Sequence, residues 1–207
     1  MTVATNAVHD IMQARKTVRK FEEGKSIPQE VVAEILQNAV TAPSASNLQP
    51  WRFLVIQDQE VKKELRSISY NQEQVETSSA IIAILGDVMM YNKAHEIYTQ
   101  SVTEGVMPQK VADYMIEAAG HQAHVPVEER KQAVSFDCGL VAMQIMLLAK
   151  ERGLETGPMA GFEKDKFAER FKLSENLVPL VFITLGYASE PAHGSSRLDA
   201  KELTRYI

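Results

Sequence analysis

The sequence predicts a three-layer domain of the α+β or α/β class, and three observations support this. Helical patterns come first along the chain, and strands interspersed with helices follow them. The apolar runs at 79–86 and 177–186 each end in glycine and are typical of strands buried on both faces. Residues 134–151 are apolar almost all around a helical circumference, which predicts a central helix or one at a subunit interface.

The length and composition fit a single domain over residues 1–207. A hydrophobic content of 45% in 207 residues is ample for one continuous core, and no repeat or low-complexity linker divides the chain. The net charge of -5 leaves no basic surplus for binding a nucleic-acid backbone, so we expect no nucleic-acid partner.

The sequence indicates a soluble, cytoplasmic protein. Residues 1–10 have no apolar core of signal-peptide length, and no window approaches the roughly 18 uninterrupted apolar residues of a membrane helix. Cys138 is the only cysteine, which excludes an internal disulfide and fits a reducing compartment. We expect its thiol to be packed and inert.

Two helices are predicted before the first strand. Apolar residues recur at helical spacing from Val8 to Met12, so a short first helix ends near Arg15. Ser26 is followed three residues later by a glutamine, the spacing of a capping box, which predicts the start of a second helix. Pro43 ends that helix.

The following segments predict a strand at 53–56, a helix around 61–65 and the buried strand at 79–86. From 88 to 130 the pattern turns mixed and polar, which predicts an excursion from the core with helices at 94–104 and 109–119.

The central helix then runs to a stop at Gly153. A helix at 163–171 and the second buried strand follow it, and the tail beyond Glu190 is predicted as loop with a short final segment.

A basic cluster, Arg15-Lys-Thr-Val-Arg-Lys-Phe21, can bind a phosphate. Arg15 and Arg19 offer forked, charge-assisted hydrogen bonds, Lys16 adds a point charge, and Thr17 adds a hydroxyl. Taken alone, the cluster also fits a solvated basic patch.

A loop of small polar residues, Pro43-Ser44-Ala45-Ser46-Asn47, leads through Gln49, Pro50 and Trp51 into the first strand. The same residue types are common in ordinary helix-to-strand turns. We expect Trp51 itself to lie in the core.

Together the two motifs resemble the FMN-dependent nitroreductase family, and three further segments occur in the family's order. Asn71 lies where the family places an amide against the flavin's pyrimidine edge. The segment 157–162 is similar to the family's Pro-Met-x-Gly-Phe/Tyr stretch, whose backbone lies near flavin N5. Arg197 matches the arginine of a Lys-x-Arg phosphate clamp, in which Ser195 replaces the lysine.

The resemblance implies that the loop at 43–47 reaches a flavin bound mainly by the other subunit. The cofactor-binding residues that it implies are Arg15, Lys16, Thr17, Arg19, Pro43, Ser44, Ala45, Ser46, Asn47, Asn71, Pro158, Met159, Ala160, Gly161 and Arg197.

The family fold implied is α+β, with a central, mainly antiparallel mixed sheet flanked by helices in an intertwined homodimer. The implied activity is ping-pong transfer of a hydride from NAD(P)H, through bound FMN, to a nitroaromatic, quinone or related acceptor. No catalytic side chain is needed for it. The excursion at 88–130 would cover the site, with Tyr91, Tyr98 and Tyr114 as candidate lining residues.

Two alternatives remain open at the sequence level: a reductase of free flavin, and a non-enzymatic flavin-binding protein. The dinucleotide, P-loop, hydrolase and metalloprotease fingerprints are all absent from the sequence. His121 and His124 have helical spacing but no accompanying ligands, so we expect surface histidines and no metal.

Overall fold

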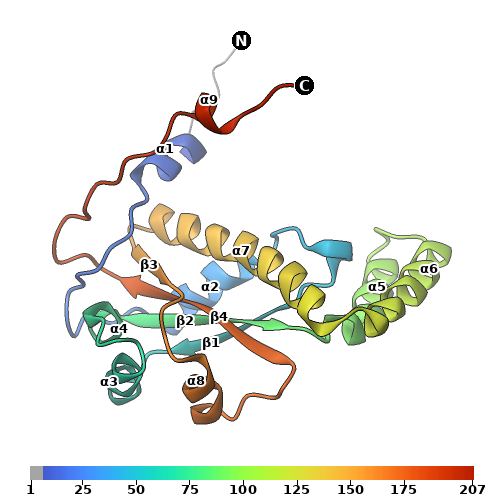
Figure 1. Cartoon of the computed structure of the whole chain (residues 1–207), viewed down its shortest axis with the longest axis horizontal. Coiled ribbons are helices and arrows are strands. Elements are labelled where there is room, and N and C mark those ends of the chain that lie inside the picture. Colours follow the sequence, from blue (N-terminus) through green and yellow to red (C-terminus); the bar gives the residue numbers. More distant parts are fainter. Residues whose placement is uncertain (1–6) are drawn as a thin grey trace.

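The computed structural model describes residues 7–207. Its centre is a four-stranded sheet in the order β1-β2-β4-β3, and all three strand pairings are antiparallel. The helices lie on the two faces of this sheet and at one end of it (Figure 1). The predicted α+β class with a mainly antiparallel sheet is therefore confirmed. The strands are β1 Trp51–Ile56, β2 Ala80–Asp87, β3 Glu155–Met159 and β4 Leu177–Gly186.

The helices follow the predicted order, with boundaries that differ by a few residues. The α-helices are α1 Ala7–Ala14, α2 Gln29–Ala39, α3 Gln59–Ser67, α4 Glu73–Thr77, α5 Ala94–Thr103, α6 Gln109–Gly120, α7 Val127–Glu151, α8 Lys164–Arg170 and α9 Ala200–Leu203. The 3-10 helices are η1 Ala45–Asn47, η2 Met90–Lys93 and η3 His121–His124.

Strand β2 lies in the middle of the core because each of its eight residues is buried. Successive side chains of a strand point to opposite faces, so Ile82 and Ile84 join the cluster that α2 and α7 cover. Ile81 and Ala83 point the other way, into the smaller cluster under α3 and α8 that includes Phe167. A strand that is buried on both faces in this way requires a run of apolar residues.

Helix α7 is 25 residues long and, by length and composition, could cross a membrane. In this fold it runs across one face of the sheet, where Val141, Ile145 and Ala149 are fully buried. The packing accounts for much of its apolar sequence without a bilayer. Phe136 on the same helix stays 69% exposed, whereas Leu140 and Met143 on its side of α7 are partly buried against the core.

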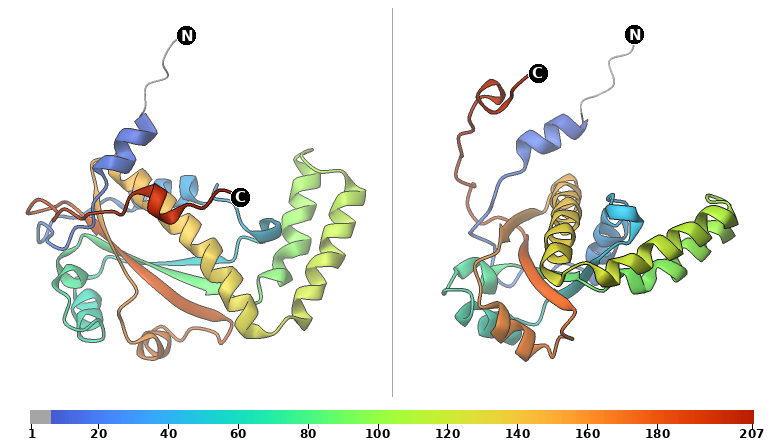
Figure 2. Two further views of the ribbon diagram at one scale, coloured as in Figure 1. Left: turned by 45° about the horizontal axis from the view of Figure 1, so that its top comes forward. Right: turned by 45° about the vertical axis from the view of Figure 1, so that its right-hand side comes forward.

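Helices α5 and α6 form an antiparallel pair that projects away from the sheet at the N-terminal end of α7 (Figure 2). They belong to the segment predicted as an excursion. Tyr114 on α6 is exposed, whereas Tyr98 on α5 is almost fully buried.

Three local predictions need correction. Ser26 does not cap α2, because the residue at the cap position is Pro28 and no side chain bonds there. The structure adds β3, which the presence of Gly157 and Pro158 made a poor strand candidate. It also adds α4, whose five residues are too few to give a helical period.

Gly157 explains why a weak strand sequence stands at this edge of the sheet. A Cβ atom at this position would lie 2.5 Å from the carbonyl oxygen of Val18 and 2.7 Å from Thr184 Oγ1. The chain at 15–19 can therefore approach β3 only where no side chain intervenes.

We expect Gly157→Ala to destabilise the protein by about 2 kcal/mol, since backbone would have to move to admit the methyl group. Gly120→Ala is the matched control, because nothing lies within 4 Å of a Cβ atom there. Urea unfolding of both variants checks this, and equal stability for the two would contradict the steric argument.

Candidate functional site

The basic segment after α1 lies along β3. The backbone N–H of Val18 donates to the carbonyl of Thr156 at 2.9 Å, and Thr17 forms a parallel bridge with the same residue. This contact carries Arg15 and Arg19 past the edge of the sheet. A single strand-like contact, made possible by Gly157, thus fixes where the cations lie.

A polar cavity of about 520 Å³ opens beside this segment and brings together the predicted phosphate ligands. Four cationic side chains line it, three from the N-terminal segment and one from the C-terminal tail. Within residues 7–207 none of the four has a carboxylate within ion-pair distance, although many other surface cations do. The charged and hydroxyl side chains in the lining are those of Arg15, Lys16, Thr17, Arg19, Ser195 and Arg197.

Two details fit this cavity to a phosphate. The Nε atom of Arg15 is buried and has no hydrogen-bond partner within the described chain. Its N–H group can therefore donate to an acceptor atom of a ligand. Arg197 donates to Ser195 Oγ at 2.8 Å and to the carbonyl of Ser196 at 2.7 Å, which orients its guanidinium. Ser195 cannot supply the charge of the family's lysine, but its hydroxyl holds the neighbouring arginine.

The Asn71 segment lies against the 158–161 segment. Gln72 Nε2 donates to the carbonyl of Gly161 at 3.2 Å, and Gln74 contacts Met159 Sδ at 3.9 Å. Asn71 itself is exposed and has a φ of 58°, which turns the chain sharply after α3. Ala160 is exposed just beyond the end of β3, so its backbone can face a ligand.

Strand β3 joins these two groups of residues. Its first residues contact the basic segment, and its last ones lead into 158–161. At roughly 3.3 Å per residue, Thr156 and Ala160 are about 13 Å apart along the chain. The arrangement suits an elongated cofactor with a phosphate at one end and a planar ring at the other.

The loop at 43–47 has an unusual backbone. Ser46, Asn47 and Gln49 all have φ near +50°, a conformation that L-residues other than asparagine rarely adopt. Each such residue costs roughly 1–2 kcal/mol, less for asparagine. Within the loop, Ser44 Oγ accepts from the N–H of Gln49 at 3.1 Å. The strained turn leaves Ala45, Ser46 and Asn47 exposed.

One chain does not bring this loop to the cation cavity. The N–H of Ala45 donates to Asp137 of α7 at 3.1 Å, and α7 continues for fourteen more residues to Glu151 before the chain turns into β3. At 1.5 Å per residue this is about 21 Å of helix. The structure therefore divides the predicted ligands into two groups, with 43–47 in one and the remaining residues in the other.

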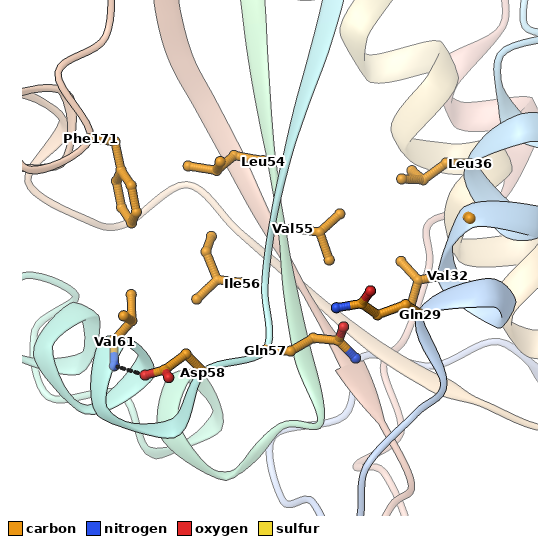
Figure 3. Close-up of a pocket in the computed structure, with 11 residues that line it drawn as sticks. Gln29, Val32, Leu36, Leu54, Val55, Ile56, Gln57, Asp58, Val61 and Phe171 are labelled. Atoms are coloured by element: carbon orange, nitrogen blue, oxygen red, sulfur yellow. Dashed lines mark hydrogen bonds between the residues drawn. The ribbon is translucent and has the colours of Figure 1, made fainter.

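A larger hollow of about 580 Å³ lies elsewhere, between α2, α3 and the edge strand β1 (Figure 3). Figure 3 shows Leu54 and Ile56 pointing toward Phe171 and Val55 pointing toward α2. The only charged side chain in its lining, Asp58, caps α3 by accepting from the N–H of Val61 at 2.9 Å. This apolar groove offers no ligand for a phosphate.

Sequence reasoning missed two residues, His193 and Asp137, and it named Tyr98 only as a candidate lining residue of the excursion. His193 lines the cation cavity from the C-terminal tail, where nothing in the local pattern distinguishes it. Asp137 and Tyr98 both contact the 43–49 loop. Asp137 could have been found from the sequence, because an aspartate on an otherwise apolar stretch of helix is unusual.

Other predicted residues are found as expected. Trp51 is buried, and Cys138 is packed in the core, where burial raises the pKa of its thiol to about 12. His121 and His124 are exposed.

Known proteins share this sequence and fold. The nitroreductase family matches residues 12–187. The protein named "Putative NAD(P)H nitroreductase YdgI" of Bacillus subtilis is 40% identical over 199 residues, covering 95% of either chain. The "CLA biosynthesis enone reductase" of Lactiplantibacillus plantarum is 28% identical, over 99% of this chain and 96% of that protein.

A solved structure gives the same result. It is described as a "putative nitroreductase in complex with FMN" from Exiguobacterium sibiricum, with 38% identity and a TM-score of 0.92, and the similarity covers 99% of this chain and 98% of that one. The family match ends at residue 187, and the relatives that cover 99% of this chain extend the similarity over nearly its whole length. The chain belongs to the nitroreductase family.

Proposed function

We propose that this protein is an FMN-dependent oxidoreductase that takes electrons from NAD(P)H and reduces nitroaromatic, quinone or related acceptors. The observation that carries the proposal is the cation cavity, where Arg15 and Arg197 are held ready without carboxylate partners. A family relative described in complex with FMN supports the choice of cofactor.

The chemistry that bound FMN supplies is hydride transfer, first from NAD(P)H and, after the nicotinamide has left, to the acceptor, which is a ping-pong sequence. The protein's own residues bind and orient. Arg15, Arg19, Lys16 and Arg197 hold the phosphate, and Thr17 adds a hydroxyl. Ala160 and Gly161, which are exposed beyond the end of β3, and the exposed Asn71 amide would face the ring.

No side chain is assigned as a general acid or nucleophile. The one cysteine is buried with a raised pKa, which leaves its thiol protonated and out of reach. The site therefore works by placing donors and charges around the cofactor, and rate would depend on how well the ring is held.

The site is completed by a second copy of the chain, whose 43–47 loop reaches the flavin held by the first. The 21 Å of helix between the two groups of ligands, about fourteen residues at 1.5 Å each, supports this division. The exposed side chain of Phe136 gives α7 an apolar contact for such pairing.

The copies are intertwined through their C-terminal tails. Residues beyond 190 run away from the body of the chain and expose Leu203, Tyr206 and Ile207 (Figure 1). Strand β1 is the edge of the sheet beside the apolar hollow of Figure 3, and it has no second neighbour within the described chain. The partner's tail supplies apolar side chains to that groove.

The whole of 1–207 acts as one such unit, in which α5 and α6 cover the site and select the acceptor. The single buried cysteine suits a cytoplasmic location.

The first test is the visible spectrum of the freshly purified protein under anaerobic titration with NADPH and then NADH. We expect a flavin spectrum that bleaches. A coloured protein that bleaches with neither donor would indicate a flavin-binding protein without this activity. A colourless protein that oxidises NAD(P)H only with added flavin would indicate a free-flavin reductase.

Arg197→Ala should raise the FMN dissociation constant about 10- to 100-fold, because a charge-assisted hydrogen bond to phosphate is lost. Quenching of flavin fluorescence measures the constant. Arg170→Ala is the matched control, since it removes an exposed arginine that pairs with Glu64 and does not line the cavity. Equal affinity in the two variants would remove Arg197 from the site.

Removal of residues 199–207 should convert a dimer into monomers and weaken FMN binding at least tenfold, since the partner loop would no longer be delivered. Light scattering coupled to gel filtration measures the mass. A truncated chain that stays dimeric would exclude the tail as the element that joins the copies.

A further inference from the structure

Two buried side chains hold the 43–49 loop from outside. Asp137 of α7 is 4% exposed and accepts the N–H of Ala45 at 3.1 Å. Tyr98 of α5 is 1% exposed, and its hydroxyl donates to the carbonyl of Ser46. The two hydrogen bonds hold adjacent residues of the loop, Ala45 and Ser46, from two different helices.

These contacts add to the hydrogen bonds within the loop, in which Ser44 accepts the N–H groups of Asn47 and Gln49. Ala45, Ser46 and Asn47 are exposed, so packing does not hold them. Left-handed φ angles at Ser46 and Asn47 are disfavoured in an isolated chain and persist only where the surroundings impose them. The buried partners on α5 and α7 are rigid compared with the loop, which makes them suitable anchors.

Burying Asp137 is not explained by stability. Its carboxyl has one hydrogen-bond donor, the N–H of Ala45, and no cation within ion-pair distance in residues 7–207. Burial raises the pKa of this carboxyl, while the Ala45 hydrogen bond opposes the shift in part. A buried acid with so little compensation makes folding less favourable, so its presence points to a role in shaping the loop.

We propose that Asp137 and Tyr98 are positioning residues, which hold the 43–47 loop in the shape that contacts the flavin. The inference rests on the proposed function, because it takes the loop to be half of the FMN site. Neither side chain touches the cofactor. Each acts through the backbone of the loop, Asp137 at Ala45 and Tyr98 at Ser46.

The Tyr98 contact also ties the projecting helices to the cofactor site. Tyr98 lies in the middle of α5, the first helix of the pair that would cover the acceptor. Its hydroxyl therefore fixes the position of α5 relative to the loop. A hydrogen bond therefore links α5, which would cover one site, to the 43–47 loop, which would complete a site.

The first experiment is Tyr98→Phe, which deletes one hydroxyl and keeps the buried ring. We expect the FMN dissociation constant to rise about fivefold or more, the worth of a typical hydrogen bond. Thr103→Val is the matched control on the same helix, since its hydroxyl bonds only to the carbonyl of Thr99 at 3.0 Å. That variant should bind FMN like the parent chain.

The second experiment compares Asp137→Leu with Asp137→Asn. Leucine fills the space but accepts no hydrogen bond, so we expect FMN affinity to fall about tenfold while the melting temperature of the cofactor-free protein stays equal or rises. Asparagine keeps an acceptor oxygen for the Ala45 N–H and should restore affinity to within about twofold. A purely structural role would lower the melting temperature in step with affinity.

The outcomes separate the two proposals. A parent chain that binds no FMN overturns the proposed function. A parent chain that binds FMN, with Tyr98→Phe and Asp137→Leu binding equally well, overturns the positioning role alone. If Asp137→Leu does not fold, the Tyr98→Phe and Asp137→Asn measurements still decide, because an Asn variant as weak as a Tyr98→Phe variant would contradict the hydrogen-bond account.

Discussion

The packing of α7 across the sheet fixes the position of the 43–47 loop and, through β3, of the basic segment. Its buried face lies against β2 and β4 through Val141 and Ile145, which are fully inaccessible to solvent. Its C-terminal end leads into β3 and so places the basic segment, and its middle holds the 43–47 loop through Asp137. A helix buried in this way cannot shift without opening the core. The basic segment and the 43–47 loop are therefore held in fixed positions.

Charge and strain are concentrated at the basic segment and the 43–47 loop rather than spread over the molecule. Several cations elsewhere on the surface are paired, as in Lys25 with Glu22 and Arg170 with Glu64. The cavity at Arg15 instead collects like charges that repel one another, and the loop at Ser46 holds disfavoured backbone angles. Both features weaken the folded state and become favourable only when an anionic, planar ligand is present.

The sequence was sufficient for the elements with a strong period or a long apolar run. It predicted β4 to the residue and β2 within one residue, because continuous burial leaves no other pattern. It missed β3, whose pairing depends on the absence of a side chain at Gly157 and on a neighbour 139 positions away in the chain. Contacts between residues so far apart in the sequence produce no local periodicity from which they could be predicted.

The candidate site was predictable where side chains form compact motifs, such as Arg15-Lys16-Thr17. It was not predictable where a single distant residue completes it, as His193 does, or where the contact of a named residue depends on the fold, as for the Tyr98 hydroxyl. The resemblance to the family supplied the expectation that the 43–47 loop completes a site on the other subunit, and in this chain the loop contacts Asp137 of α7 and does not line the cation cavity.

The burial of Cys138 has a consequence for the chemistry of such an enzyme in air. Reduced flavins give up electrons to oxygen, and the peroxide that results attacks thiolates before thiols. With a pKa of about 12, only about one thiol in 10⁵ is ionised at neutral pH, and the sulfur is enclosed at the centre of α7. The only thiol of the chain is therefore buried where peroxide formed at the flavin would react with it least.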